Sequence, residues 1–121
     1  MFDPKEFLDQ AKEMITEAHG NSEAYFRSAI NRSYYSAHLV ARESLLKKGL
    51  VHPNSLGIIS HRTVISRIPT ATEPALGDQL DYLFELRKKA DYDLLTKIDE
   101  NEAKGAIELS ERLLSKIQSQ F

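Results

Sequence analysis

Arg87 is the charged residue whose position most needs explaining. On a helical wheel of about 100° per residue it lies in the middle of an apolar face. That face consists of Leu76, Leu80, Leu83, Ala90 and Leu94. A guanidinium that loses its water needs a partner, and Asp91, one turn later, is the nearest candidate. Two interpretations follow: an Arg87–Asp91 pair that organises the helices, or a groove or subunit interface in which Arg87 binds phosphate.

Arg32 marks a second candidate surface, on a longer predicted helix. The stripe of this helix expected to face the core consists of Phe26, Ile30, Tyr34, Ala37, Ala41 and Leu45. A second, partly apolar face surrounds Arg32 on the opposite side and consists of Tyr25, Ala29, Tyr35, Ser36, Leu39 and Val40. Because a helix with two apolar faces usually has two contacts, we expect this face to meet segment 61–68 or another protein chain. Arg32 beside Tyr35 suits a protein interface or stacking on bases.

Cap and breaker residues divide the chain into the helices that must position these side chains. The first predicted helix lies between the Asp3 cap and Gly20, which follows His19, and the second runs from the Asn21 or Ser22 cap to Lys47-Lys48-Gly49. A short third helix covers 61–68 and is stopped by Pro69. The fourth covers about 73–95 and is capped by Thr72, and the fifth begins at the Asp99–Glu102 capping box. Residues 50–60 are predicted to form a loop. No segment alternates with the period of a strand.

Composition agrees with this pattern. The 121 residues are 41% hydrophobic and 28% charged with few Gly and Pro, which is typical of one globular domain over residues 1–121. We therefore predict an all-α protein, an antiparallel four-helix up-and-down bundle with a short extra helix in the central connection. No apolar run approaches a membrane span, and the acidic start does not resemble a signal peptide, so we expect a cytoplasmic protein without a membrane partner.

The charges are unevenly distributed. Seven basic residues and one acid lie between Arg27 and Arg67, whereas the remainder carries nine bases and seventeen acids. This basic segment is either a solvated helix face or a surface for an anionic partner such as nucleic acid, nucleotide or an acidic protein.

Common catalytic and metal-binding motifs are missing from the sequence. It has no cysteine, no phosphate-binding glycine loop and no pair of histidines at i, i+4, so we expect neither a metal nor another cofactor. Any chemistry would be metal-free acid–base catalysis or electrostatic stabilisation.

Four segments in register resemble the HEPN domains (higher eukaryote and prokaryote nucleotide-binding), in their stand-alone prokaryotic branch. They are Asn31-Arg32-Ser33-Tyr34-Tyr35-Ser36-Ala37-His38, similar to an R-x-Y-Y segment; Leu-Leu-Lys-Lys-Gly at 45–49; Ser60-His61; and Leu86-Arg87-Lys88-Lys89-Ala90-Asp91-Tyr92. Together they span roughly residues 22–118. The resemblance implies an all-helical bundle, commonly a homodimer, often encoded beside a small nucleotidyltransferase with which it forms a toxin–antitoxin pair.

Several HEPN proteins are metal-independent ribonucleases with an R-x(4–6)-H motif, in which Arg and His from two subunits face one cleft. Here Arg87 matches the arginine, but Tyr92 stands five residues later in place of histidine. A phenol is a poor general base at neutral pH. Arg32 and His38 also have this spacing, but they point about 120° apart on the wheel and lie in the wrong helix, so we interpret that match as coincidence.

Three functions remain open from the sequence. In the first, a ribonuclease-type toxin, Arg87 stabilises phosphate charge and Tyr92 or His61 supplies a proton. In the second, a non-catalytic module binds nucleotide, RNA or a nucleotidyltransferase antitoxin through Arg32, Tyr35, Arg87, Asp91 and Tyr92, and Tyr92 is the leading candidate for adenylylation by that partner. The third is a purely structural homodimer. The sequence leaves open whether the surfaces around Arg32 and Arg87 form one groove.

Overall fold

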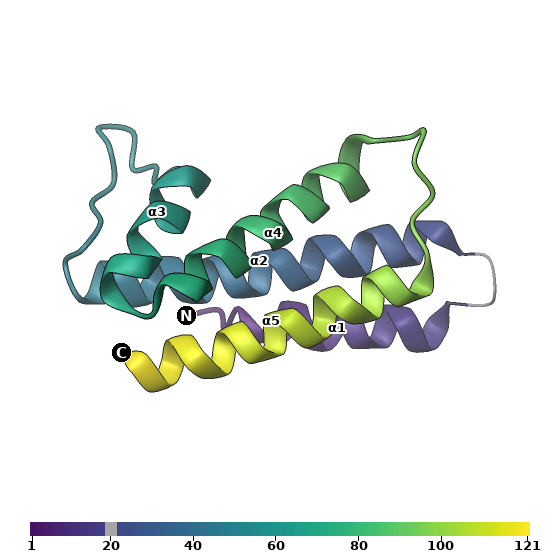
Figure 1. Ribbon diagram of the computed structural model, residues 1–121, viewed down its shortest axis with the longest axis horizontal. Coiled ribbons are helices and arrows are strands. Elements are labelled where there is room, and N and C mark those ends of the chain that lie inside the picture. The colour runs from purple at the N-terminus through teal and green to yellow at the C-terminus, as the bar shows by residue number, and fades with distance from the viewer. Residues whose placement is uncertain (19–21) are drawn as a thin grey trace.

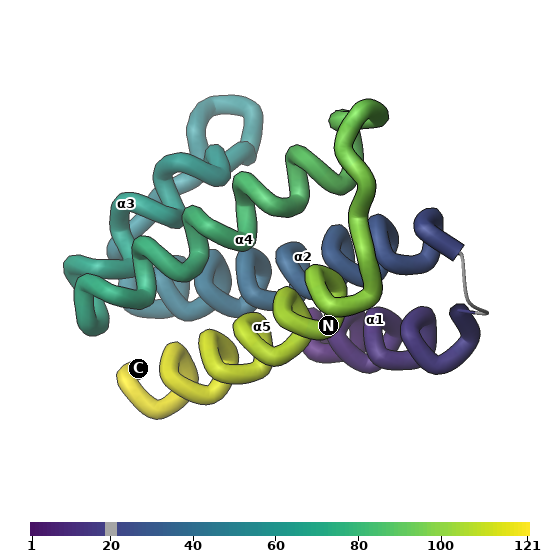
Figure 2. The backbone as a smooth tube through the Cα atoms, turned by 45° about the vertical axis from the view of Figure 1, so that its right-hand side comes forward, coloured from purple at the N-terminus to yellow at the C-terminus, as the bar shows by residue number. Residues whose placement is uncertain are grey.

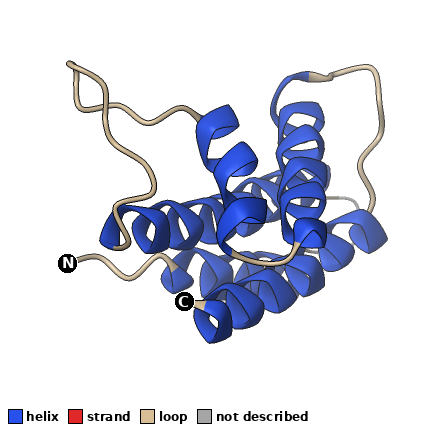
Figure 3. Cartoon of the chain, turned by 60° about the vertical axis from the view of Figure 1, so that its left-hand side comes forward, coloured by secondary structure: helices blue, strands red, loops and turns tan. Residues whose placement is uncertain are grey.

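The computed structural model describes residues 1–18 and 22–121, which contain five helices and no strand (Figures 1 and 3). The helices are α1 (Lys5–Glu17), α2 (Glu23–Lys47), α3 (His61–Ala71), α4 (Pro74–Tyr92) and α5 (Glu100–Gln120). The predicted all-α class is therefore confirmed. The predicted stop at His19 and Gly20 and the predicted cap at Asn21 lie outside the described residues.

Helix α2 is the centre of the fold and contacts all four other helices. Helices α1, α2 and α5 lie side by side, α4 crosses α2 at an inclination, and α3 packs on α4 and α2 (Figures 1 and 2). The core-facing stripe predicted on α2, Phe26 to Leu45, is buried along its whole length. The second face around Arg32 has two contacts: Tyr35 lies edge-on to His61 of segment 61–68, as predicted, whereas Arg32 donates to Gln10 of α1, which was not predicted.

The predicted caps are present at several helix ends. The Asp99 side chain accepts the backbone N–H of Glu102 at 2.8 Å, which is one half of the predicted capping box. At the end of α2, Gly49 adopts a φ of +69°, which favours glycine. Asp3 is not the cap of α1: Pro4 occupies that position, and the Asp3 carboxylate accepts the N–H of Lys5 at 3.0 Å. Thr72 is not the cap of α4: Glu73 occupies that position, and the Thr72 hydroxyl donates instead to the carbonyl of Ile68 at 2.7 Å.

Two helix boundaries differ from the prediction. Helix α3 continues through Pro69 to Ala71, because the proline ring fits against α4 at Gly77, where a Cβ would come within 2.3 Å of the ring. Helix α4 ends at Tyr92 rather than near residue 95. The Asp93 carboxylate accepts the N–H groups of Leu95 and Thr96, and these bonds form a turn that ends the helix. Leu94 is consequently exposed and does not belong to the apolar face of α4.

In the part of the chain that the structure describes, none of the helices is long and apolar enough to span a membrane.

Candidate functional site

Arg87 lies where the wheel places it, on the face of α4 that packs against α2, and its side chain is only 10% exposed. Its guanidinium carbon lies over three rings, at 5.5 Å from the ring centre of Tyr34, 5.6 Å from that of Tyr35 and 5.4 Å from that of Phe84. These are distances at which a cation is attracted to the face of a ring. Aromatic side chains thus offset part of the cost of burying this charge.

The predicted Arg87–Asp91 pair is present, but its contact is long. Nη1 of Arg87 donates to Oδ2 of Asp91 at 3.3 Å, and the side-chain amide of Asn31 donates to the same oxygen at 3.0 Å. Nε of Arg87 is buried and has no partner among the residues described. A guanidinium carries five N–H donors, so a single carboxylate contact leaves the guanidinium of Arg87 largely unsatisfied.

Arg32 is connected to the same residues through Asn31. Its Nη1 donates to the amide oxygen of Asn31 at 2.6 Å, and its Nε donates to Gln10 of α1 at 2.8 Å. Asn31 therefore links Arg32 to Asp91, and Asp91 links this chain of contacts to Arg87. The surfaces around the two arginines are joined by hydrogen bonds rather than separated.

His61, the first residue of α3, reaches the rings beneath Arg87. Its Nδ1 lies 2.5 Å from the hydroxyl of Tyr34, and its ring stacks on His38 at 4.3 Å and on Phe84 at 5.3 Å. Burial, together with the charges of Arg87 and Arg42, lowers the pKa of His61. The imidazole is therefore neutral at pH 7. Its hydrogen bond with Tyr34 fits either tautomer, because the hydroxyl can donate to Nδ1 or accept from it.

Tyr34 stays protonated in this setting. Its side chain is fully buried, and burial raises the pKa of its hydroxyl far above the usual range despite the opposing charge of Arg87. The phenol can therefore donate to His61 or accept from it, but it does not ionise near neutral pH. It serves to orient the imidazole.

His38 belongs to this cluster although the sequence did not indicate it. It is 3% exposed, and burial, with the charges of His61 and Arg42, lowers its pKa to about 3. The available signal was its place one turn after Tyr34, on the side of α2 that faces α3 and α4. Arg32 turns instead to α1, so the Arg32–His38 spacing does not bring the two side chains together.

Tyr35 and Tyr92 have contrasting positions. Tyr35 is half-buried and presents its ring edge-on to His38 and His61, at 6.2 Å and 5.9 Å. Tyr92 ends α4 and is 73% exposed, with no hydrogen bond or ring contact to any residue that the structure describes. Of the predicted site residues, Arg32, Tyr35, His61, Arg87 and Asp91 lie in one connected cluster, and Tyr92 stands apart from it.

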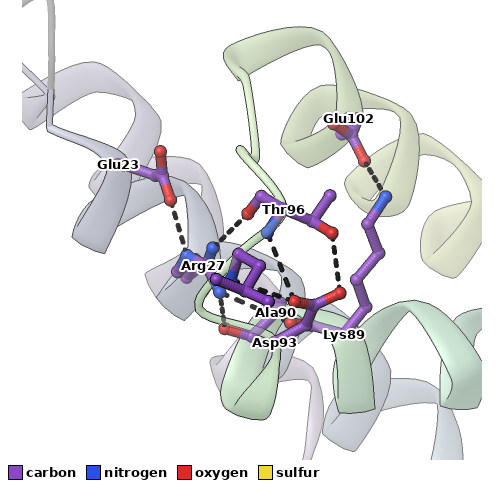
Figure 4. A network of polar contacts seen from close by, with 8 residues as sticks. Glu23, Arg27, Lys89, Ala90, Asp93, Thr96 and Glu102 are labelled. Carbon is purple, nitrogen blue, oxygen red and sulfur yellow. Dashed lines mark hydrogen bonds and ion pairs between the residues drawn. The ribbon is translucent and has the colours of Figure 1, made fainter.

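Arg27 holds the end of α4 that carries Asp91 (Figure 4). Its guanidinium donates to Glu23 at 2.8 Å and to the carbonyls of Lys89, Ala90 and Thr96 at 3.4, 2.9 and 2.5 Å. These carbonyls belong to the last turn of α4 and to the connection that follows it. This role could not be predicted from the sequence, because nothing local to residue 27 identifies partners more than 60 positions away.

The described residues contain no group of three or more His, Cys, Asp or Glu side chains that could hold a metal ion. The chemistry that the cluster offers is that of a buried cation, a neutral imidazole and a hydroxyl that orients it.

In a comparison with known families, the model of the HEPN domain matches residues 4–120. The match extends the segment of resemblance, roughly 22–118, to include α1. The comparisons with curated proteins and with solved structures give no match. Since the matched segment covers nearly the whole chain, this protein belongs to the HEPN domain family.

Proposed function

We propose that this HEPN-domain protein binds nucleotide or RNA and that Arg87 is its phosphate-binding residue. Family membership indicates a function related to nucleotides or RNA. The observation that carries the proposal is the unsatisfied guanidinium of Arg87, whose Nε is buried without a partner in the described chain. A buried donor without an acceptor is costly, and such groups in native proteins have a specific reason.

Phosphate oxygens are acceptors that fit this donor. Arginine binds phosphate through parallel N–H donors, and a partly desolvated setting strengthens the contact. Tyr35 lies beside the guanidinium with part of its ring accessible, where a base can stack. Arg32, connected through Asn31, adds positive charge toward α1.

The same cluster supports metal-independent RNA cleavage. The ribose 2′-oxygen would attack phosphorus as its proton passes to His61, and the bond to the 5′-oxygen would break, with the leaving 5′-oxygen taking up a proton from His61 or water. Arg87 would stabilise the added negative charge on the phosphate oxygens. This role requires the tautomer in which Nδ1–H donates to Tyr34 and the other nitrogen is free to accept. His61 suits proton transfer better than Tyr92, because it is neutral and lies in the Arg87 cluster.

The wider context is part of the proposal. The Arg32-Ser33-Tyr34-Tyr35 and Leu86–Tyr92 segments support membership of the stand-alone prokaryotic branch. On that basis we propose a homodimer that is the toxin-like member of a pair with a small nucleotidyltransferase, whose adenylylation target would be the exposed Tyr92. We also assign α1, α2, α4 and α5 to the four helices of an up-and-down bundle, with α3 in the central connection.

A second candidate, a non-catalytic binding module, is favoured by one observation. The residue at the position of the family histidine is Tyr92, which lies on the surface away from Arg87. Such a module would form a saturable, salt-sensitive complex with RNA or nucleotide and would show no turnover.

The deciding experiment measures binding and cleavage of a labelled RNA in EDTA by the wild type, Arg87→Lys and Arg87→Ala. Arg112→Ala, at an exposed position of α5 outside the basic segment, is the matched control. The proposal predicts that the wild type and the control bind equally and that both Arg87 variants bind more weakly, Ala more than Lys. Cleavage lost with Arg87→Ala establishes a nuclease, and binding without cleavage establishes the module. If the wild type binds neither RNA nor nucleotide, the proposal is wrong and a purely structural dimer remains.

A further inference from the structure

The contact between Arg87 and Asp91 is longer than that between Arg62 of α3 and Asp81 of α4. Each pair is joined through one nitrogen, but the exposed Arg62 donates to Asp81 at 2.8 Å, whereas the buried Arg87 donates to Asp91 at 3.3 Å. Arginine–carboxylate pairs that fix a structure are commonly short and bidentate. The carboxylate of Asp91 therefore neutralises Arg87 while accepting a hydrogen bond from only one nitrogen of the guanidinium.

We propose that Asp91 is an internal counter-anion that occupies Arg87 in the free protein and that a phosphate group of the ligand replaces it. This inference rests on the proposed function, since it concerns the ligand that Arg87 binds. A carboxylate and a phosphate present the same kind of atom, a negatively charged oxygen, to the guanidinium. Phosphate carries more charge and more oxygens than a carboxylate, so it can use donors that Asp91 leaves unsatisfied, including Nε.

Asn31 makes this exchange feasible. Its amide donates to the same Oδ2 atom of Asp91 that Arg87 contacts, at the shorter distance of 3.0 Å. A carboxylate that leaves Arg87 therefore keeps one hydrogen bond from α2. The Asp91 side chain is 23% exposed and lies one residue before the end of α4, so water can also solvate the displaced group. The anion is thus retained nearby and not expelled.

The exchange determines which ligands the site accepts. A ligand must supply a full negative charge to Arg87, because displacing Asp91 with a neutral group would leave a buried cation unpaired. Nucleosides without phosphate should therefore fail to bind, whereas inorganic phosphate, nucleoside monophosphates and RNA should compete for one site. Asp91 discriminates against uncharged ligands and against weak anions.

The test compares wild type with Asp91→Asn, which keeps the shape of the side chain and its acceptor for Asn31 but removes the competing charge. Inorganic phosphate is titrated while thermal unfolding is followed, and labelled RNA is titrated at fixed salt. Asp81→Asn, which removes the carboxylate of the surface pair with Arg62, is the matched control. We expect Asp91→Asn to unfold at a lower temperature without phosphate, because Arg87 loses its counter-anion, and to regain more stability than wild type as phosphate is added.

The expected gain in affinity is about tenfold for both phosphate and RNA, which is what about 1.4 kcal/mol of lost competition provides. Asp81→Asn should match wild type in both titrations. Asn31→Ala provides a second variant if Asp91→Asn does not fold. It removes the donor that retains the displaced carboxylate, so it should bind phosphate more weakly than wild type.

The outcomes separate this inference from the function on which it rests. Tighter binding by Asp91→Asn, or weaker binding by Asn31→Ala, supports the exchange. If binding depends on Arg87 but Asp91→Asn binds equally or more weakly, Asp91 contributes to the ligand site directly and the exchange is wrong, while the proposed function stands. If neither wild type nor Asp91→Asn responds to phosphate or RNA, the proposed function fails together with the inference.

Discussion

Two buried arginines, Arg27 on α2 and Arg87 on α4, have opposite hydrogen-bonding environments. Their side chains are 15% and 10% exposed, so both charges are largely withdrawn from water. Arg27 donates to one carboxylate and three backbone carbonyls, whereas Arg87, within the described residues, donates only to Asp91. Burial alone therefore does not distinguish the two arginines: the satisfaction of their donors does.

The difference has a physical origin in the acceptors. The last carbonyls of a helix lack an intrahelical partner, and Arg27 donates to that of Ala90 at 2.9 Å, while the carbonyl of Lys89 also accepts the N–H of Asp93. Arg87 lies in mid-helix, where the backbone carbonyls are already bonded, and aromatic rings surround it. Rings stabilise a cation without saturating its N–H donors. Arg27 is consequently fixed by the fold, and Arg87 retains capacity for an external acceptor.

The largest effect that tests this comparison is on stability. We expect Arg27→Met to lower the free energy of unfolding by about 3 kcal/mol, because it leaves carbonyls of α4 and of the following connection without donors. Arg87→Met should cost about 1 kcal/mol, since the methionine stem keeps the ring contacts and Asp91 retains Asn31. Urea denaturation of both variants measures the difference. Equal losses would contradict the distinction between the two arginines.

The neighbours of Arg87 could be predicted from the sequence better than the neighbours of Arg27, and we call these two sets of residues the Arg87 region and the Arg27 region. Periodicity was sufficient to find Arg87, since an arginine on an apolar face is conspicuous, and i, i+4 spacing identified Asp91. The contacts of Arg27 depend on how α2 and the end of α4 meet, which no local pattern encodes. His38 was missed for the same reason: its partner His61 comes from another helix.

The predicted helix boundaries were wrong where tertiary contacts, or turns closed by a side chain, override local signals in the sequence. Pro69 normally ends a helix, but the absence of a side chain at Gly77 lets the proline ring pack and α3 continue. The turn closed by Asp93 ended α4 early and exposed Leu94, which the wheel had placed on the apolar face. The cap at Asp99 was predicted correctly because capping depends only on residues close in sequence.

Acidification should act first on the Arg87 region. His38 has a pKa of about 3 in the fold against an ordinary value of 6.5, so below pH 6.5 the unfolded chain takes up a proton that the folded chain refuses. Stability therefore falls as pH decreases from 6.5 toward 3, by about 1.4 kcal/mol per pH unit for this group. Denaturation at pH 6.5 and pH 5 measures the slope.

The Arg27 region responds to acid in a lower range. Hydrogen bonds from Thr96 and Leu95 hold the pKa of Asp93 below its ordinary 3.8, so the turn that it closes weakens only as pH falls through that lowered value.

His38→Phe, which keeps the ring stacking and has no titrating group, should flatten the slope between pH 6.5 and 5. An unaltered slope in His38→Phe would assign the acid response elsewhere.

The smallest effect is expected at Tyr92, which the Arg87 region does not include. Tyr92→Phe removes a hydroxyl from a side chain that is 73% exposed, so stability should change by less than about 0.5 kcal/mol. RNA binding should also be unchanged, and so should any cleavage, because His61 rather than Tyr92 shares the cluster with Arg87. The same cleavage assay on His61→Asn should then show the loss that Tyr92→Phe does not. If instead Tyr92→Phe abolishes cleavage while RNA binding persists, the hydroxyl reaches Arg87 across a subunit interface. The unsatisfied donors of Arg87 would then belong to a site that two copies of the chain complete.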